Sequence, residues 1–269
     1  MSEPVETAYA KLNLALHVRE KRADGYHRIE TLFVFCEDGD QLTAERADDI
    51  SLGIVGPFAA ELQGQSNLVS DAAAALRDAS GTSAGAKLHL TKNLPIGSGL
   101  GGGSADAAAA LRLLNRLWGL NWPIEKLEPV ARALGSDVAP CLYSLPMRGE
   151  GRGDELESVD LGLAGRPMLL INPRTALSTA DVFAKWDGVD RGPLEIWRAG
   201  RNDLEQPASE LAPLIPTVLA WLGAQPGVEC ARMSGSGATC FALFDSERAR
   251  NDAAEAVPRE WWRLATRLR

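Results

Sequence analysis

Five glycines fall within seven positions, at residues 97–103. The glycines occupy positions 97, 99, 101, 102 and 103, and Ser104 follows them. Because glycine lacks a Cβ atom, its backbone N–H groups can approach a ligand closely. A helical pattern begins at Ala105, and the start of a helix presents unpaired N–H donors and the positive end of its dipole. The pattern therefore predicts a phosphate-binding loop.

The glycine run matches parts of two nucleotide-binding motifs. Gly97-x-Gly99-x-x-Gly102 fits the dinucleotide fingerprint, which needs a second parallel strand with an acidic residue about 20 positions later. A second helical pattern at 124–134 follows instead, so this motif is excluded. Gly97-x4-Gly102 also begins a Walker A motif, but Gly103 stands where its lysine belongs. We therefore expect main-chain donors and Ser104 to hold the phosphate, with positive charge supplied from elsewhere in the chain.

Three further side chains could carry chemistry or have only a structural role. Lys11 and Asn13 are two apart in an alternating segment, so they share a strand face at a spacing of about 7 Å. That face is either a solvated surface or part of a site. Asp137 precedes a helical segment, and it is either a helix cap or a catalytic carboxylate.

Two more segments carry groups that suit a ligand. Tyr26 and His27 follow the turn signal Asp24-Gly25, and this aromatic pair either stacks on a ring or simply packs. Residues 234–237 read Ser-Gly-Ser-Gly, which suits backbone donors to a phosphate but, taken alone, favours a hairpin connection.

The elements that must position these residues mix strands and helices without regular βαβ alternation, which predicts an α+β fold. Clean alternation over 9–18 predicts a half-buried strand. Asn202 is expected to cap a helix start, and residues 146–153 to connect two lobes spanning 1–155 and 156–269. The other expected strands are 28–35, 87–91, 168–171, 228–232 and 240–244, and the expected helices are 67–76, 105–117, 124–134 and 213–222.

Composition excludes several classes of protein. The net charge of −8 argues against nucleic acid as a partner, although a cleft can still attract a small anion. No apolar run reaches the roughly 18 residues of a membrane span. Four cysteines without close pairs indicate neither zinc nor a disulfide framework. We expect a cytoplasmic protein that acts on small molecules, without a membrane or nucleic-acid partner.

These segments together resemble the GHMP kinase superfamily, whose middle motif has the form P-x-x-x-G-L-G-S-S-A. The segment from Pro95 to Ala105 matches it, with Gly102 and Gly103 in place of the first serine. Further matching segments are 10–14, 24–27, 134–138 and 233–239. The resemblance implies a two-lobed α+β fold with the active site in the cleft between the lobes. It also implies ATP as phosphoryl donor, Mg²⁺ carried in with ATP rather than held by a dedicated protein site, and a monomer or homodimer.

The resemblance also implies a role for particular residues. Asp137 would be the catalytic aspartate and Lys11 its partner, and sequence leaves open whether Asp137 accepts a proton or only orients a hydroxyl. The ATP site would comprise Asn67, Leu68, Lys92, Pro95, Gly97, Gly99, Leu100, Gly101, Gly102, Gly103 and Ser104. The acceptor site would comprise Asn13, Tyr26, His27, Thr179 and Phe183, with Ser234, Gly235, Ser236 and Gly237 forming a third glycine motif.

Within the superfamily, Asp24-Gly25-Tyr26-His27 combined with Gly135-Ser136-Asp137-Val138 resembles one kind of member. Those kinases phosphorylate the 2-hydroxyl of a cytidine-diphosphate-linked methylerythritol, in the non-mevalonate route to isoprenoid precursors. Tyr26 and Phe183 would then stack on either side of the cytosine. The alternatives are a sibling kinase acting on mevalonate, homoserine or a sugar, which offers no ring to stack, and a nucleotide-binding module without catalysis.

Overall fold

The computed structural model describes residues 5–269, which form two compact units that are interleaved along the chain. The first unit holds residues up to 10, 38–96 and 101–144, and the second holds 11–37, 97–100 and 145–269. Two long strands, β1 (Val5–Lys21) and β2 (His27–Ala47), each contribute residues to both units. The α+β class expected from the sequence is confirmed.

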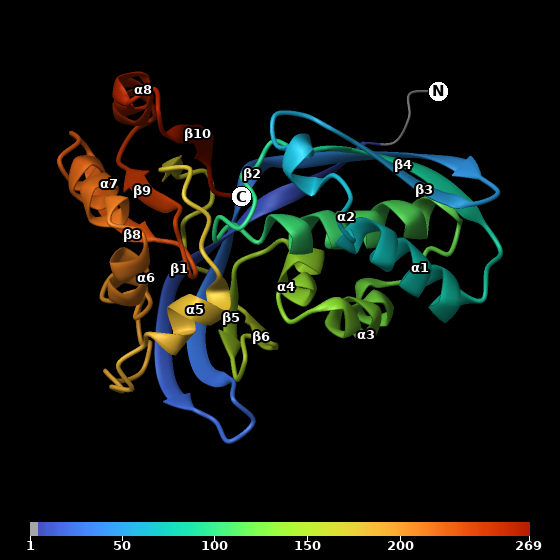
Figure 1. Cartoon of the computed structure of the whole chain (residues 1–269), viewed down its shortest axis with the longest axis horizontal. Helices are drawn as coiled ribbons and strands as arrows, with labels where there is room; N and C mark the ends of the chain where they lie inside the picture. The colour runs from blue at the N-terminus through green and yellow to red at the C-terminus, as the bar shows by residue number, and fades with distance from the viewer. Residues whose placement is uncertain (1–4) are drawn as a thin grey trace. The chain divides into compact units, whose positions relative to one another are not determined.

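In the first unit, four helices gather beside a small sheet (Figure 1). Strand β4 pairs in parallel with β3 and antiparallel with residues 41–47 of β2. The helices pack as α1 on α2 and α3, and α4 on α2 and α3. Alanines fill the buried face of α2 from Ala105 onward, which lets its neighbours approach closely. The elements are β3 (Ile50–Val55), a 3-10 turn η1 (Ala59–Leu62), α1 (Leu68–Ser80), β4 (Gly85–Thr91), α2 (Gly102–Leu117), α3 (Ile124–Leu134) and α4 (Val138–Tyr143).

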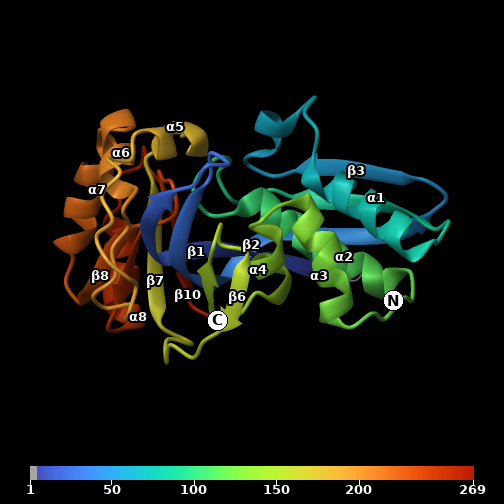
Figure 2. The ribbon, with the colours of Figure 1, turned by 90° about the horizontal axis from the view of Figure 1, so that it is seen from below.

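In the second unit, strands 11–21 of β1 and 27–37 of β2 belong to one sheet with β5 and β6, and a separate antiparallel sheet has the order β10-β7-β9-β8. Helices α7 and α8 pack on the second sheet, as Figure 2 shows. Its core includes Leu169, Ile171 and Phe244. The elements are β5 (Met147–Glu150), β6 (Glu155–Ser158), β7 (Pro167–Asn172), α5 (Thr179–Ala184), α6 (Glu205–Leu211), α7 (Leu214–Gly223), β8 (Val228–Met233), β9 (Cys240–Phe244), α8 (Glu247–Ala256) and β10 (Trp262–Arg267).

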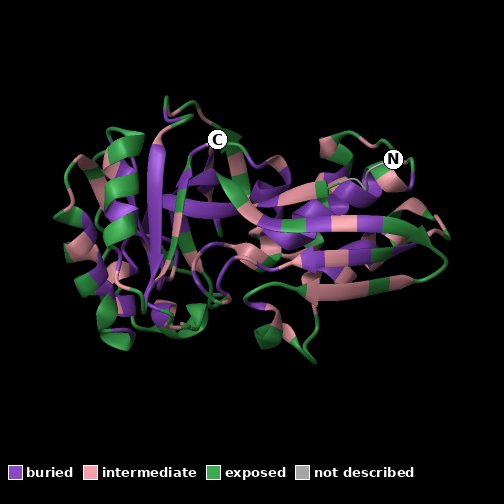
Figure 3. Ribbon diagram, turned by 90° about the horizontal axis from the view of Figure 1, so that it is seen from above, coloured by how far each residue is buried: buried purple, intermediate pink, exposed green. Residues whose placement is uncertain are grey.

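Two expectations about strands were wrong. Residues 146–153 are not a plain connection, because Met147–Glu150 forms β5 and pairs with both β2 and β6. Strand β1 is not half-buried, since Lys11 and Asn13 are buried like Leu12 and Leu14 on its other face. Figure 3 shows in purple how much of the ribbon is buried. The two polar side chains are accommodated there because they have polar partners, described below.

The expected helix start at Asn202 is shifted. Helix α6 begins at Glu205, and its N-cap position is Leu204, whose side chain makes no capping hydrogen bond. Asn202 instead accepts from the Leu204 N–H and donates to the carbonyls of Met233 and Gly235. Among the helices of residues 5–269, none combines the length and apolar character that crossing a membrane requires.

Candidate active site

The first part of the glycine run, Gly97–Leu100, lies against the turn after β8 in the second unit. The Ser234 hydroxyl donates to the Gly99 carbonyl at 2.8 Å, and the Thr239 N–H donates to the Ser98 carbonyl at 3.1 Å. Gly99 has a φ of +79°, and a Cβ there would lie 2.4 Å from the Ser234 carbonyl oxygen. Only glycine fits this approach, so the middle and third glycine motifs form one backbone assembly.

The second part of the run forms the start of α2 in the first unit. Gly101 is the N-cap residue, with a φ of +60°, and no side chain caps the first turn. The N–H groups of Gly102, Gly103 and Ser104 are thus among the helix-start donors that lack an intrahelical partner. Gly103 is exposed. This arrangement suits a phosphate group, as the sequence predicts.

Lys11 and Asn13 belong to a buried polar group on β1. The Asn13 N–H donates to the Ser234 hydroxyl at 3.1 Å, and its side-chain amide donates to Thr31 Oγ1 at 2.7 Å. Lys11 Nζ donates to Asn13 Oδ1 at 3.4 Å and lies 4.7 Å from the centre of the Phe33 ring. The Lys11 N–H also donates to the Leu100 carbonyl at 3.0 Å. The alternative of a solvated outer face is therefore wrong, and Lys11 and Asn13 lie beside both glycine motifs.

Asp137 lies in the first unit, at the N-cap position of α4. Its carboxylate makes no capping hydrogen bond to the first turn, so the structure does not use it as a helix cap. The residue is partly exposed, whereas the helix that follows it is almost wholly buried. A partly exposed carboxylate on a firmly packed helix suits a reaction with a ligand.

Asn67 and Leu68 lie where α1 begins. The Asn67 side chain accepts from the Val69 N–H at 2.9 Å and caps the helix, and Asn67 also lines a cavity of about 530 Å³. Ile50, Leu52, Leu62 and Asp71 are among the other lining residues. Leu68 reaches the start of α2, since its Cδ1 lies 3.7 Å from the place of a Cβ on Gly103.

Lys92 is buried in an ion-pair group beneath the start of α2. Its Nζ lies 2.6 Å from Asp40 Oδ2 and 2.6 Å from Asp106 Oδ2, and 3.0 Å from the place of a Cβ on Gly102. Burial lowers the pKa of Lys92, but the two carboxylates outweigh burial and leave it above its ordinary value. Asp40 also accepts the N–H groups of Asn93 and Leu94. The group thus fixes the chain that leads into the glycine run.

The Lys92 group leads to a prediction about pH. Burial raises the pKa of Asp106 to about 7, against the opposing charge of Lys92, and Asp106 Oδ1 is buried without a hydrogen-bond partner. Because the folded state holds this proton more tightly than the unfolded chain, Asp106 stabilises the fold at low pH and loses that effect as pH rises through about 7. In the wild type, the free energy of unfolding should fall as pH rises from 5 to 8. We expect Asp106→Asn to make this fall smaller by on the order of 2 kcal/mol.

Urea unfolding of wild type and variant at several pH values measures this difference. The matched control is Asp78→Asn, which changes an exposed aspartate on α1 of the same unit. An unchanged pH slope in Asp106→Asn would show that Asp106 does not titrate in this range.

An aromatic cluster lies at the start of β2, in the second unit. The His27 and Phe183 rings are 4.9 Å apart and tilted by 30°, and the Trp186 ring meets His27 edge-on at 5.5 Å. Tyr26 is 57% exposed, and its ring contacts the Arg152 guanidinium at 4.8 Å. Burial and then the charge of Lys21 hold the pKa of His27 below its ordinary value. A neutral imidazole beside exposed aromatic surface suits a planar, uncharged ring as ligand.

The remaining predicted residues of the acceptor site join this region to the third glycine motif. The hydroxyl groups of Thr179 and Ser236 are 2.9 Å apart, so Thr179 at the start of α5 contacts the Ser234–Gly237 turn. Gly235 lies beside β1, because a Cβ there would be 3.2 Å from Asn13 Oδ1. Asn13, Thr179 and the turn are thus connected within one unit.

Trp186 is expected to control the environment of His27. Trp186→Ala removes the ring that meets His27 edge-on, so His27 should gain solvent and its pKa should rise toward the ordinary value. The chain has three histidines, so a proton NMR titration can follow each imidazole separately. An unmoved His27 titration would contradict the contact.

Sequence reasoning missed Trp186, Asp40 and Asp106. Trp186 stands three positions after Phe183. In a helical pattern this spacing places two side chains on one face, so the sequence could have indicated that the two rings lie close together. Asp106 is the one acidic residue in the otherwise alanine- and leucine-rich segment 105–111, so its burial required a partner. Nothing in the spacing of Asp40 indicates that it pairs with Lys92.

No three His, Cys, Asp or Glu side chains of residues 5–269 are grouped so that they could hold a metal ion.

Family models identify the class of protein. The model of the GHMP kinases N terminal domain matches residues 67–144, and that of the GHMP kinases C terminal matches residues 191–264. The chain belongs to the GHMP kinases.

Particular relatives within this family are more informative. The chain is 52% identical to 4-diphosphocytidyl-2-C-methyl-D-erythritol kinase of Rhizorhabdus wittichii, covering 99% of this chain and 95% of the relative. It is 49% identical to the protein of that name from Novosphingobium aromaticivorans, covering 98% and 92%. A solved 4-(cytidine 5'-diphospho)-2C-methyl-D-erythritol kinase superposes with a TM-score of 0.85 at 32% identity, covering 98% of this chain and 99% of that one. Mevalonate kinase of Methanococcus jannaschii, at 9% identity and a TM-score of 0.71, shares the fold.

Proposed function

We propose that this protein is an ATP-dependent kinase that phosphorylates the 2-hydroxyl of 4-diphosphocytidyl-2-C-methyl-D-erythritol. The product would be the 2-phosphate with ADP, in the non-mevalonate route to isoprenoid precursors. Relatives of 43–52% identity over nearly the whole chain carry this enzyme's name. The observation that carries the choice of acceptor is the cluster of His27, Phe183 and Trp186, with the exposed Tyr26 next to His27 in sequence, which suits a cytosine ring. Mevalonate, homoserine and sugars have no aromatic ring that could stack on such a cluster.

ATP fits the glycine residues of this chain. The first turn of α2 lacks a side-chain cap, and Gly103 is exposed, so the N–H groups of 102–104 can face phosphate oxygens. When bound, ATP supplies the phosphoryl group, and Mg²⁺ enters the site bound to ATP. Asn67 and Leu68 would lie near the adenosine part, with Pro95 and residues 97–101 around the phosphates. Lys92, buried between two carboxylates, would supply positive charge from beneath the loop.

At the acceptor, we assign Asp137 to the hydroxyl and Lys11 to the transferring group. A tertiary alcohol becomes a better nucleophile when a carboxylate accepts or orients its proton, and Asp137 would do one of the two. Lys11 would stabilise the negative charge of the transferring phosphoryl group. Asn13 and His27 would hold the cytidine diphosphate part, Tyr26 and Phe183 would stack on the base, and Thr179 would lie close by.

An acceptor panel tests this proposal. The protein is incubated with ATP and Mg²⁺ and with the cytidyl substrate, mevalonate, homoserine or galactose in turn, and products are identified by mass. We expect a gain of one phosphoryl group on the cytidyl substrate alone. Transfer to mevalonate, homoserine or galactose instead would establish a sibling kinase, and ATP binding without any product would establish a binding module.

Three expectations from the sequence stay predictions. They are the division of the chain into lobes at 155/156, a cytoplasmic location, and a monomer or homodimer that binds neither nucleic acid nor membranes.

A further inference from the structure

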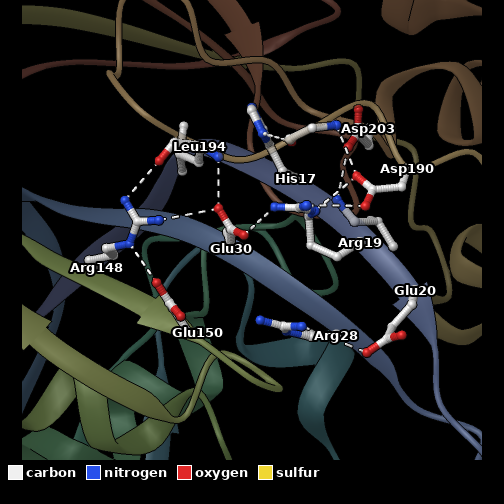
Figure 4. Close-up of polar contacts among 12 residues, drawn as sticks. His17, Arg19, Glu20, Arg28, Glu30, Arg148, Glu150, Asp190, Leu194 and Asp203 are labelled. Carbon is white, nitrogen blue, oxygen red and sulfur yellow. Dashed lines mark hydrogen bonds and ion pairs between the residues drawn. The ribbon is translucent and has the colours of Figure 1, made fainter.

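Glu30 is a buried carboxylate near the start of β2, two residues before the apolar run 32–36. Arg19 and Arg148 both form ion pairs with it, the latter at 3.2 Å, and the Leu194 N–H donates to its Oε2 at 2.7 Å (Figure 4). The phosphoryl-transfer chemistry described above does not use this residue. A buried charge in a strand requires partners, and these partners come from three separate parts of the second unit.

One of those parts is the connecting segment, residues 187–203, between α5 and α6. It contains no helix or strand, and polar contacts hold it to the β1–β2 hairpin. Asp190 pairs with Arg19 at 2.9 Å, and the Gly192 carbonyl lies 3.1 Å from His17 Nδ1. The Leu194 carbonyl accepts from Arg148 Nη1 at 2.7 Å, so Leu194 is held through both its N–H and its C=O.

Three carboxylates surround the two arginines of this contact. Asp190 and Glu150 neutralise the outer sides of Arg19 and Arg148, while Glu30 neutralises their buried sides (Figure 4). Burial and then the charge of Arg201 lower the pKa of His17, so its imidazole adds no third positive charge. Removing the Glu30 charge would leave the buried sides of both arginines without a carboxylate, while Asp190 and Glu150 still pair with their outer sides.

Glu30 lies close in sequence to one half of the aromatic cluster, and the connecting segment lies close to the other half. His27 is three residues from Glu30 along β2, a separation of about 10 Å. Phe183 and Trp186 come immediately before the connecting segment, in and after α5. The Glu30 contacts therefore join the strand that begins at His27, directly after Tyr26, to the chain that carries Phe183 and Trp186.

We propose that Glu30 is a positioning residue for the nucleobase site: by tying Leu194 and both arginines together, it sets the spacing between Tyr26–His27 and Phe183–Trp186. This inference rests on the proposed cytidyl substrate. In this proposal Glu30 acts through Leu194 of the connecting segment and through the two arginines, and not by contact with the substrate.

The test compares Glu30→Gln with Glu150→Gln. Both variants remove a carboxylate from the same arginine, Arg148, but Glu150 is on the exposed side. For Glu30→Gln we expect KM for the cytidyl substrate to rise about tenfold, with kcat and KM for ATP within about twofold of wild type. Glu150→Gln should match wild type in all three values. A merely structural role would lower kcat or raise both KM values together.

Trypsin provides a second readout that needs no substrate. Arg191 and Arg198 are exposed cleavage sites in the connecting segment, and cleavage there follows the population in which the segment is detached. We expect Glu30→Gln to be cut after these two residues about tenfold faster than wild type or Glu150→Gln. Mass analysis of the fragments identifies the cleavage sites.

A wild-type KM for the cytidyl substrate in folded Glu30→Gln overturns the proposal, as does an equal rise in both KM values. Should Glu30→Gln not fold, Arg148→Lys decides, because lysine keeps the charge but loses the fork that reaches Leu194 and Glu30 together. In Arg148→Lys, a rise of about threefold in KM for the cytidyl substrate, with kcat and KM for ATP as in wild type, supports positioning. An unchanged KM for the cytidyl substrate in this variant overturns the proposal. Failure of the proposed function is separately visible, since wild type would then not phosphorylate the cytidyl substrate at all.

Discussion

Replacing Asp137 by asparagine is expected to lower kcat for phosphoryl transfer by about 10³-fold. The amide keeps the shape of the side chain but accepts no proton at neutral pH, so the acceptor hydroxyl stays a poor nucleophile. The dissociation constant for ATP should stay within about twofold, because the glycine run and not Asp137 is assigned to the phosphates. Single-turnover kinetics and equilibrium titration of a nucleotide analogue measure the two effects.

Asp78→Asn is the matched control for this variant, since it makes the same chemical change on the exposed face of α1 in the same unit. It should behave as wild type. If Asp137→Asn keeps more than a tenth of wild-type turnover, Asp137 is not the proton acceptor of the reaction. The structure already excludes its simplest structural role, because the carboxylate does not cap α4.

Gly99→Ala is expected to lower kcat/KM for ATP by about 100-fold and the free energy of unfolding by about 3 kcal/mol. The new methyl group would lie 2.4 Å from the Ser234 carbonyl oxygen and 2.9 Å from that of Gly237. Both obstacles are backbone atoms, so the glycine run and the Ser234–Gly237 turn would have to separate. Steady-state kinetics and denaturant unfolding measure the two losses.

Variants of two other glycines distinguish backbone strain from steric clash as the cause of these losses. Gly119→Ala places alanine at a similar φ of +70° with nothing within 4 Å, so it shows the backbone strain without the clash. Gly103→Ala adds a methyl that meets only Leu68 at 3.7 Å, and alanine favours a helix by about 1 kcal/mol. Equal losses in Gly99→Ala and Gly119→Ala would show that strain alone, and not contact between the two motifs, explains the effect.

The elements around the glycine run could be predicted because their signals are local. Alternation in β1 and β4, the Asn67 cap of α1 and the alanine-rich face of α2 each lie within a short window of sequence. The glycine run at 97–103 indicates close backbone approach in the same way. These features do not depend on residues far along the chain.

Other features could not be predicted because they depend on distant partners. Lys11 and Asn13 alternate with leucines, and this pattern alone left a solvated face and a site both open. Thr31 and Ser234, which allow Asn13 to be buried, lie 18 and 221 positions from it. Lys92 is paired with Asp40, 52 positions away. Strand β5 is short and charged, and only its pairing with β2 and β6 makes it a strand.

Phosphorus NMR of one reaction mixture, containing the protein, ATP, Mg²⁺ and the cytidyl substrate, examines the whole account in a single experiment. The account predicts that ADP forms while one new phosphomonoester resonance grows in equal amount, and that the substrate's own diphosphate resonances persist. Loss of those diphosphate signals, or ADP formation matched only by free phosphate, would contradict transfer to the acceptor hydroxyl.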